Sequence, residues 1–310
     1  MQRVLSTIVL LGLLLATAAA FAITEHLKLI KSPIYATHVT KVFSPVCHCA
    51  TDKAEITFTL RSSDSITVTI VDASGHEVAT LATDQPVQKG TVIFHWDGRT
   101  DAGTVAPDGS SYQPQVDLAN ARRTIRMPNE ITVDTTAPDV LSASAGDGGL
   151  LITGGHHTIA IRYVFSDRAR AYVYLGTRRL IVSRRKLPHG QVKWNGKSQG
   201  RSLRPGRYVL EVAAVDKNGN VTPPAERKRV VVRISPLALG KTSIHVAAGA
   251  RFTVKVRTAA KTYTWKFAGK HGAEKKKLLH LRAPSRRGRY RLVVSEHGHS
   301  TSAIVIVSRK

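Results

Sequence analysis

The stretch HWDGRTDAGTVAPDGSSYQPQVDL, residues 95–118, holds the side chains of this sequence that are best suited to chemistry. Asp97, Asp101 and Asp108 stand close together among glycines and threonines. Carboxylates at short spacing could hold a hard cation such as Ca²⁺, which takes most of its ligands as oxygen. Asp and Gly also build tight turns, because Asp bonds to nearby backbone and Gly accepts a positive φ. The surrounding elements decide between these two roles.

The Asp/Gly stretch lies between runs whose apolar residues alternate. Residues 54–62 and 65–74 precede it, a further run leads into Trp96, and the alternation resumes at Tyr112. Period-2 patterning that is rich in Val, Ile and Thr predicts half-buried strands. We therefore expect the aspartates to lie in connections between strands.

The same pattern recurs downstream, in KWNGKSQGRSLRPGRYVLEV, residues 193–212. A third, degraded copy ends in Gly288-Arg289-Tyr290. From Trp to Tyr the first copy has 16 residues and the second has 14. The recurring positions are Trp96, Asp97, Gly98, Gly109 and Tyr112, matched by Trp194, Asn195, Gly196, Gly206 and Tyr208.

The repeat loses Asp101 and Asp108 but keeps Trp, Asx-Gly and Tyr. A calcium loop has to keep its carboxylates, whereas a turn needs only the positive φ that Asx-Gly supplies. The sequence therefore favours turn chemistry over a metal site, and it predicts neither a metal nor a cofactor. We expect the Trp and Tyr side chains to fill small β cores.

The order of these elements resembles a known family. ITFTLRSSDSITVTIVDASGHEVATL, followed by FHWDGRTDAGTVAPDGSSYQPQVDL, is similar to the immunoglobulin-like domain of FlgD, the flagellar hook-capping protein, and of many bacterial surface proteins. The resemblance covers residues 50–135 well and 155–235 loosely. It implies a β-sandwich that serves as a structural or adhesive module. It does not imply flagellar work, because the rest of a hook cap has no counterpart in this sequence.

Composition predicts the boundaries between domains. Residues 133–149 and 233–244 are rich in small, turn-forming residues that are typical of linkers. The runs downstream of residue 30 carry no helical period, so we predict an all-β class: tandem immunoglobulin-like β-sandwiches behind an N-terminal hydrophobic helix. The predicted segments are 1–23 (transmembrane anchor or signal peptide), 24–45 (linker), 46–140 (FlgD-like Ig domain), 141–235 (second Ig-like sandwich) and 236–310 (third Ig-like sandwich).

Residues 4–22, VLSTIVLLGLLLATAAAFA, carry no charged side chain. As a helix they span about 28 Å, close to the bilayer core of about 30 Å. Arg3 before the run and Ala20-Phe21-Ala22 at its end also fit a cleavable export signal. The length of the run and the large Phe21 favour a retained single-span anchor. With either fate, we expect the rest of the chain outside the cytoplasm.

Cys47 and Cys49, in SPVCHCATD, are the two cysteines of the chain. Outside the cytoplasm we expect two thiols to pair, although in extended chain this spacing puts the Cα atoms near the upper limit for a disulfide. Two structural thiols are one alternative. A metal or redox half-site of Cys47, His48 and Cys49 is another, but it lacks a second ligand pair. We predict a local or intermolecular disulfide.

Charge is distributed unevenly along this chain, whose formal net charge is +25. Residues 24–140 carry 10 Lys+Arg against 14 Asp+Glu, residues 141–235 carry 18 against 5, and residues 236–310 carry 17 against 2. A surface this basic attracts polyanions. A solvated surface without a specific ligand is the alternative.

The basic residues of the distal domains cluster, for example in ERKRVVVR at 226–233. Arg suits phosphate because its planar fork donates two hydrogen bonds at once. We expect contacts with anionic cell-wall polymer or lipid headgroups, with other surface proteins, and with the membrane through the N-terminal helix, but not with nucleic acid. The predicted polyanion contacts are Arg178, Arg179, Arg184, Arg185, Lys186, Lys275, Lys276, Lys277, Arg286, Arg287 and Arg289.

Catalytic motifs are missing from the sequence. It contains no Gly-x-Ser-x-Gly elbow, phosphate loop, His-Glu-x-x-His or dinucleotide fingerprint. We therefore expect no catalytic residues and a membrane-anchored extracytoplasmic protein whose basic domains bind an anionic wall or lipid. A second hypothesis is an assembly subunit or chaperone of an extracellular appendage that acts through sheet edges. The third is a carbohydrate-binding accessory of a secreted hydrolase.

Overall fold

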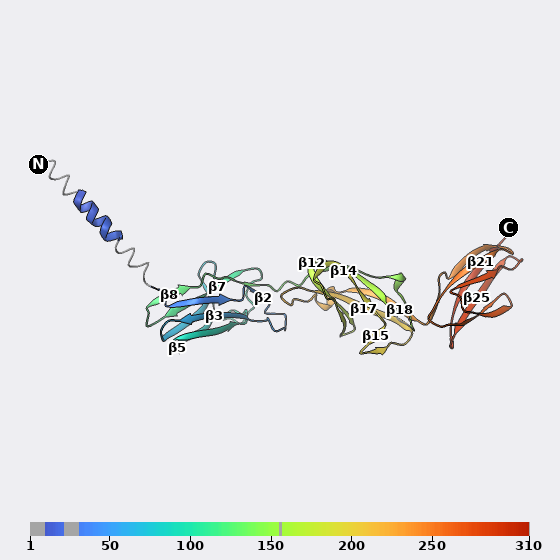
Figure 1. Ribbon diagram of the computed structural model, residues 1–310, viewed down its shortest axis with the longest axis horizontal. Coiled ribbons are helices and arrows are strands. Elements are labelled where there is room, and N and C mark those ends of the chain that lie inside the picture. The colour runs from blue at the N-terminus through green and yellow to red at the C-terminus, as the bar shows by residue number, and fades with distance from the viewer. Residues whose placement is uncertain (1–9, 22–30, 155–156, 310) are drawn as a thin grey trace. The chain divides into compact units, whose positions relative to one another are not determined.

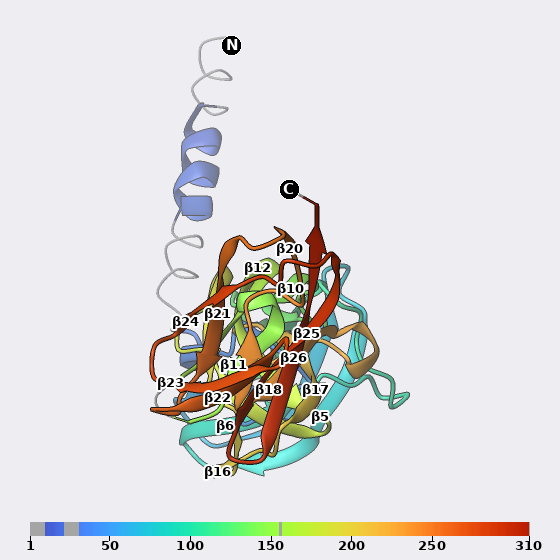
Figure 2. The same ribbon diagram turned by 90° about the vertical axis from the view of Figure 1, so that its right-hand side faces the viewer.

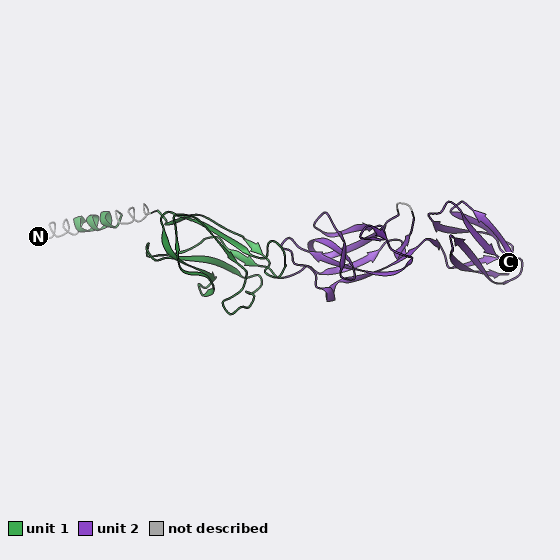
Figure 3. Cartoon of the chain, turned by 90° about the horizontal axis from the view of Figure 1, so that it is seen from below, with its two compact units in different colours: residues 1–135 green, residues 136–310 purple. Residues whose placement is uncertain are grey.

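The computed structural model describes residues 10–21, 31–154 and 157–309. They fall into two compact units, residues 1–135 and 136–310 (Figure 3). The first unit holds one apolar core and the second holds two, between Val140 and Ile234 and between Leu237 and Val307. We refer to residues 31–135, 136–235 and 236–309 as the first, second and third domains. The strands confirm the predicted all-β class (Figure 1).

The first domain is a sandwich of two sheets in which most neighbouring strands are antiparallel. One sheet has the order β1-β3-β6, and the other has the order β2-β9-β7-β4-β5, with β8 beside β7. Alternate residues of β3 and β7 are buried, as period-2 patterning predicts. The strands are β1 (Ile34–Val39), β2 (Val42–Phe43), β3 (Ala54–Leu60), β4 (Asp64–Asp72), β5 (Glu77–Val87), β6 (Gly90–Trp96), β7 (Ser111–Leu118), β8 (Arg123–Arg126) and β9 (Ile131–Val133).

The structure corrects the expectation that residues 24–45 form a linker. Residues 31–45 belong to the first domain, because β1 pairs with β3 and β2 pairs in parallel with β9. Ile34, Val39 and Phe43 are buried in its core. The alternation of this segment is broken by a register shift after Tyr35, which hides the strand from a period-2 search. Residues 24–30 lie outside the described part of the chain.

Trp96 and Trp194 end equivalent strands and close equivalent turns. The Trp96 indole N–H donates to Arg99 O at 2.8 Å, and the Trp194 N–H donates to Lys197 O at 3.0 Å. The next residue, Asp97 or Asn195, accepts the backbone N–H two positions on. Gly98 and Gly196 follow, each at φ +74°. An L side chain rarely adopts this conformation, so the turn requires glycine.

The second domain contains one long strand that serves two sheets. The first half of β12 (Ile159–Leu175) pairs with β10 and β14, and its second half pairs with β13 and β17. The remaining strands are β10 (Val140–Ala145), β11 (Leu150–Ile152), β13 (Arg178–Val182), β14 (Leu187–Trp194), β15 (Lys197–Ser198), β16 (Arg201–Ser202), β17 (Gly206–Val215) and β18 (Lys228–Ser235), with short 3₁₀ turns η1 (Asp147–Gly149) and η2 (Pro224–Glu226).

The third domain has sheets of order β19-β21-β24 and β20-β26-β25-β22-β23, and all of these strands except β19 are labelled in Figure 2. The Tyr290 hydroxyl donates to Arg286 O at 3.0 Å, as the Tyr208 hydroxyl of the second domain donates to Arg204 O at 2.8 Å. The strands are β19 (Leu237–Leu239), β20 (Ser243–Ala247), β21 (Arg251–Thr258), β22 (Tyr263–Phe267), β23 (Lys270–Glu274), β24 (Leu278–Arg282), β25 (Gly288–Glu296) and β26 (His299–Ser308).

Residues 10–21 form a helix, in which the Thr17 hydroxyl donates to Leu13 O at 3.0 Å or Leu14 O at 2.9 Å. Within the described residues, no helix combines the length and the apolar character that crossing a membrane requires. The rest of the predicted apolar run, residues 4–9 and 22, lies outside the described residues.

Candidate functional site

Of the aspartates of the opening stretch, Asp101 lines a cleft of about 720 Å³ in the first domain, and Asp97 and Asp108 lie outside its lining. Asp101 accepts the backbone N–H and the hydroxyl of Thr80, at 2.9 and 3.0 Å. Asp108 accepts the N–H and the hydroxyl of Thr135. Asp101 therefore ties its connection to strand β5, and Asp108 ties its connection to the segment that follows β9. Across residues 10–21, 31–154 and 157–309, no three His, Cys, Asp or Glu side chains gather as a metal site.

Asp72, also in the cleft wall, closes a turn. Its carboxylate accepts the N–H groups of Ser74 at 2.8 Å and His76 at 2.9 Å, and Gly75 between them has φ +88°. The hydrogen bond from the His76 backbone is the main reason why the pKa of Asp72 lies below its ordinary value. The Asp72 carboxylate is thus the hydrogen-bond acceptor that closes this turn.

The outer face of one sheet in the second domain carries tyrosines and arginines in pairs. Tyr172 and Tyr174 are alternate residues of β12, so their side chains share a face. The Arg179 guanidinium lies over the Tyr172 ring, 4.6 Å from its centroid, and that of Arg227 lies over the Tyr174 ring at 4.1 Å. We call this surface the arginine–tyrosine face and define it as Tyr172, Tyr174, Arg179, Arg207, Glu211, Arg227, Arg229 and Arg233.

Strand register brings these residues together. Tyr174 lies opposite Arg179 of β13 on one side and opposite Glu211 of β17 on the other. Glu211 in turn lies opposite Arg229 of β18. Its carboxylate is 3.6 Å from Arg227 and 3.9 Å from Arg229. A single row of polar side chains therefore crosses four strands, with one acid among several arginines.

The Arg227 side chain is largely buried, whereas the Arg229 side chain is exposed to solvent. The Arg227 side chain is 13% exposed, and its Nε is buried with no hydrogen-bond partner in the described part of the chain. Burial raises the pKa of Tyr174 above its usual value of 10, although Arg227 and Arg179 act in the opposite direction. The phenol therefore stays neutral at physiological pH and offers a cation–π surface. The Arg229 side chain is 78% exposed and accessible to a ligand.

Arg207 and Arg233 face each other directly across β17 and β18, and both are exposed. The exposed pair Val209 and Val231 separates them from the Glu211–Arg229 row. Like charges directly opposite each other destabilise a sheet. An anion between the two guanidinium groups would remove this repulsion, and bidentate arginine contacts suit phosphate oxygens.

The comparisons with known proteins concern the domains rather than this face. Residues 45–122 match the family model of the FlgD Ig-like domain. This stretch is a FlgD Ig-like domain. It contains the Asp72 turn, the Trp96 turn and the cleft that Asp72 and Asp101 line. No curated protein sequence matches the chain.

Several solved structures of tandem domains are similar in fold. One is the Bacteroides ovatus mixed-linkage glucan utilization protein SGBP-B, in complex with a mixed-linkage heptasaccharide. Its identity to this chain is 12% and the TM-score is 0.29; the match covers 88% of this chain and 64% of that protein. Fibronectin(III)-like modules of Clostridium thermocellum CbhA have 14% identity over 64% of this chain and 94% of theirs, with a TM-score of 0.34. An I-band fragment of titin has 11% identity over 91% of this chain and 100% of its own, with a TM-score of 0.31. The likeness concerns the fold alone.

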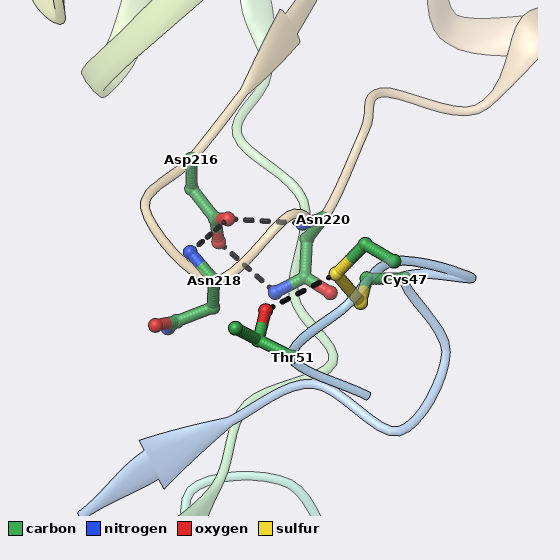
Figure 4. Close-up of a disulfide and its surroundings, with 6 residues drawn as sticks. Cys47, Thr51, Asp216, Asn218 and Asn220 are labelled. Atoms are coloured by element: carbon green, nitrogen blue, oxygen red, sulfur yellow. Dashed lines mark hydrogen bonds between the residues drawn. A yellow bond between two sulfur atoms is a disulfide. The ribbon is translucent and has the colours of Figure 1, made fainter. Parts of the chain in front are cut away.

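Cys47 and Cys49 form a disulfide at the start of the FlgD Ig-like domain (Figure 4). The chain is not extended there, because Cys47 N–H donates to Ser44 O at 3.4 Å and His48 has φ +49°. This turn brings the two Cα atoms to 5.2 Å. Disulfide sulfurs carry no hydrogen, so the Thr51 hydroxyl is the donor in its 3.2 Å contact with Cys49 Sγ.

Figure 4 also shows a turn of the second domain that repeats the geometry of the Asp72 turn. The Asp216 carboxylate accepts the N–H groups of Asn218 at 2.8 Å and Asn220 at 2.9 Å. Gly219 lies between them at φ +94°. The Asp-x-x-Gly element thus makes one turn in both domains.

The predicted polyanion contacts do not form a single patch. Arg178 and Arg179 begin β13, whereas Arg184, Arg185 and Lys186 follow its far end. Lys275–277 precede β24, and Arg286, Arg287 and Arg289 follow it at the opposite end. The backbone N–H groups of Lys275 and Lys276 donate to Glu274 Oε1, and the Tyr263 hydroxyl donates to Lys276 O. Of the contacts predicted by number, only Arg179 belongs to the arginine–tyrosine face, to which the basic cluster at 226–233 adds Arg227, Arg229 and Arg233.

Sequence reasoning missed the tyrosines and the acid of this face. Tyr172 and Tyr174 were visible as alternate aromatic residues in RARAYVYLGTRR, residues 168–179. Their period of two places them on one face of a strand. Glu211 carried no such signal, because its role depends on the register of β17 against β12 and β18.

Proposed function

We propose that this protein is a non-enzymatic, membrane-anchored extracytoplasmic binding protein whose second domain contacts a phosphate-bearing polymer or lipid of the cell envelope. The opposed Arg207 and Arg233 carry the proposal, because their repulsion is relieved by a bound anion. The apolar run at residues 4–22 supports the anchor and the extracytoplasmic location.

The chemistry of the face fits a flexible polyanion better than a single small ion. Arg229 extends the positive surface along the sheet, and Val209 and Val231 give it an apolar floor. Stacking on Tyr172 and Tyr174 fixes two further guanidinium groups in place, which reduces the entropy lost on binding. Binding of this kind weakens with salt, because exposed charges are screened over about 8 Å at physiological ionic strength.

The full chain and an Arg207→Ser/Arg233→Ser variant should be compared for retention on three supports. These are purified cell wall, wall stripped of its anionic polymer, and vesicles that contain an acidic phospholipid. We expect the double substitution to weaken retention about tenfold or more, since hydrogen bonds to charged groups contribute about 1.5–3 kcal/mol each. Stripped wall and vesicles distinguish polymer from lipid as the source of phosphate.

A matched variant controls for total charge. Lys53→Ser/Arg123→Ser removes two exposed cations from the first domain and lowers the net charge by the same amount. We expect it to bind nearly as well as the wild-type chain. If both variants lose retention equally, the basic domains attract polyanions without a site, and the proposed role of the face is refuted.

An assembly subunit of an extracellular appendage is the second candidate, and the match of residues 45–122 to the FlgD Ig-like domain favours it. Such a protein would act through contacts between sheets rather than through phosphate. Co-purification of appendage subunits with the full chain, undisturbed by the Arg207→Ser/Arg233→Ser substitutions, would support this role.

A further inference from the structure

Strand β6 of the first domain presents a regular edge. It pairs with β3 in one continuous register, from Gly90–Leu60 to Trp96–Ala54. Among the described residues, its other side carries no strand. Half of its backbone N–H and C=O groups therefore face away from the sheet, which makes the edge a template for a further strand.

The edge strands β5 and β1 of the first domain are protected, and β6 is not. β5 carries several register shifts, Pro86, and Asp84 at φ +45°. β1 has a register shift and Ala36 at φ +50°. The sequence of β6, GTVIFHW, contains neither proline nor a Lys, Arg, Asp or Glu. Bulges, proline and charge are the devices by which natural sheets block pairing at an edge.

The equivalent strand of the second domain shows the contrast. β14, LPHGQVKW, ends in Trp194 as β6 ends in Trp96. It carries Pro188 and Lys193 and directly follows the cations of residues 184–186. The same structural position is therefore blocked in one domain and open in the other.

The exposed side chains of β6 suit a second copy of the same strand. Ile93 is 55% exposed and stands at the midpoint of Gly90–Trp96. In an antiparallel pair, residues directly opposite share a face. A two-fold axis at Ile93 would place it opposite its own copy and Thr91 opposite His95, and this register uses all seven residues of the strand. It would also bring the half-buried Val92 and Phe94 against each other at the open side of the core.

We propose that the first domain pairs with a second copy of this chain, β6 against β6 in antiparallel register about Ile93. The two sheets β1-β3-β6 then become one continuous sheet. The charge of the first domain is consistent with pairing between two identical chains. β6 is neutral and residues 24–140 carry more acidic than basic residues, whereas the strongly basic distal domains repel their copies.

Cysteine cross-linking of the full chain in detergent tests the register. In a Cys47→Ser/Cys49→Ser background, Ile93→Cys places two thiols across the axis, where the Cα spacing of an antiparallel pair of about 4.5–5.5 Å suits a disulfide. We expect a covalent dimer on mild oxidation. Thr91→Cys alone is the matched control, because its copy lies about 14 Å away along the strand. Mixed with His95→Cys chains, Thr91→Cys should cross-link again.

Sedimentation of the full chain tests the association itself. We expect a concentration-dependent dimer that Ile93→Lys abolishes. Val164→Lys, at an exposed position of the central strand β12, should leave it intact. A thermal melt shows that both variants remain folded. The proposal is overturned if the chain is monomeric at every concentration, if Ile93→Lys still dimerises, or if Thr91→Cys alone cross-links as well as Ile93→Cys.

Discussion

The first two domains share a local design and differ in what surrounds it. Each ends a strand in a buried Trp whose indole N–H bonds three residues ahead, and each continues through Asx-Gly. The Asp72 and Asp216 turns are likewise the same. The first domain has an open neutral edge and an acidic balance, whereas the second has a blocked edge and a basic face. Turn chemistry is therefore shared between the domains, while surface chemistry differs between them.

The largest effect should come from the two buried indoles. Trp96→Ala and Trp194→Ala each remove a fully buried side chain, and such changes cost about 3–5 kcal/mol. We expect the loss to be greater for Trp96, because it also packs against Phe43 and Tyr112, with ring centroids 5.7 and 5.1 Å away. Denaturant unfolding of the full chain measures both, and the third domain's transition, reported by Trp265, should not move. An equal or greater loss at Trp194 would contradict the role of the aromatic cluster.

The glycines of the Trp turns should give a smaller effect. An added Cβ at Gly98 would lie 2.8 Å from Pro45, whereas Gly103 has a similar φ of +77° and open space around it. We expect Gly103→Ala to cost about 1–2 kcal/mol from the positive φ alone, and Gly98→Ala to cost clearly more. Thermal unfolding of the two variants checks the difference.

The second domain also has one crowded glycine and one glycine with open space around it. A Cβ at Gly196 would meet Leu151 Cδ2 at 2.8 Å, and Gly200 is open at φ +75°. The end of a leucine side chain can move, whereas the ring of Pro45 cannot move as easily. We therefore expect Gly196→Ala to destabilise the protein more than Gly200→Ala does. This difference in unfolding free energy should be smaller than the difference between Gly98→Ala and Gly103→Ala. Equal differences would show that the two turns are equally confined.

The two tyrosines should give the smallest effect at neutral pH. Tyr208→Phe removes one hydrogen bond to Arg204 O, which contributes about 0.5–1.5 kcal/mol. Tyr112 instead shows its effect in alkali, because burial raises the pKa of its phenol above 10. Its contribution to stability is present below pH 10 and is lost as the pH rises above that value.

Urea unfolding at neutral pH and above pH 10 measures these effects. We expect the wild-type chain to lose more stability in alkali than Tyr112→Phe does, since phenylalanine does not titrate. Tyr208→Phe should keep the alkaline loss of the wild-type chain. A Tyr112→Phe variant that declines as steeply as the wild type would assign the loss to other groups.

Periodicity and repetition predicted much of the fold. Alternation located β3, β4 and β7, and the recurrence of Trp96 at Trp194 predicted a shared turn. The match between Gly109 and Gly206 does not extend to conformation, because Gly109 has φ +69° and Gly206 is an ordinary first residue of β17. The different Trp-to-Tyr spacing shifts the strand start, so the glycine in the sequence repeat has two structural roles.

The arginine–tyrosine face could be predicted only in part. Linear clusters of Arg and Lys were visible, but residues 178–179 and 184–186 lie at opposite ends of β13, and residues 275–277 and 286–289 lie on either side of β24. The opposed Arg207 and Arg233 are 26 positions apart, and only the register of β17 against β18 makes them neighbours. β1 was missed because a register shift interrupts its alternation. Contacts that depend on register leave no local pattern in a single sequence.

Each domain has an early strand that runs parallel to its last one, and this has a mechanical consequence. β2 joins β9 through two residue pairs, β11 joins β18 through three, and β20 joins β26 through five. When the two ends of a domain are pulled apart, parallel neighbours slide past each other, so their hydrogen bonds are loaded together rather than one after another. A chain that is stretched from its two ends would therefore resist extension by shear in each domain. The first domain, in which the parallel strands share the fewest residue pairs, would yield first.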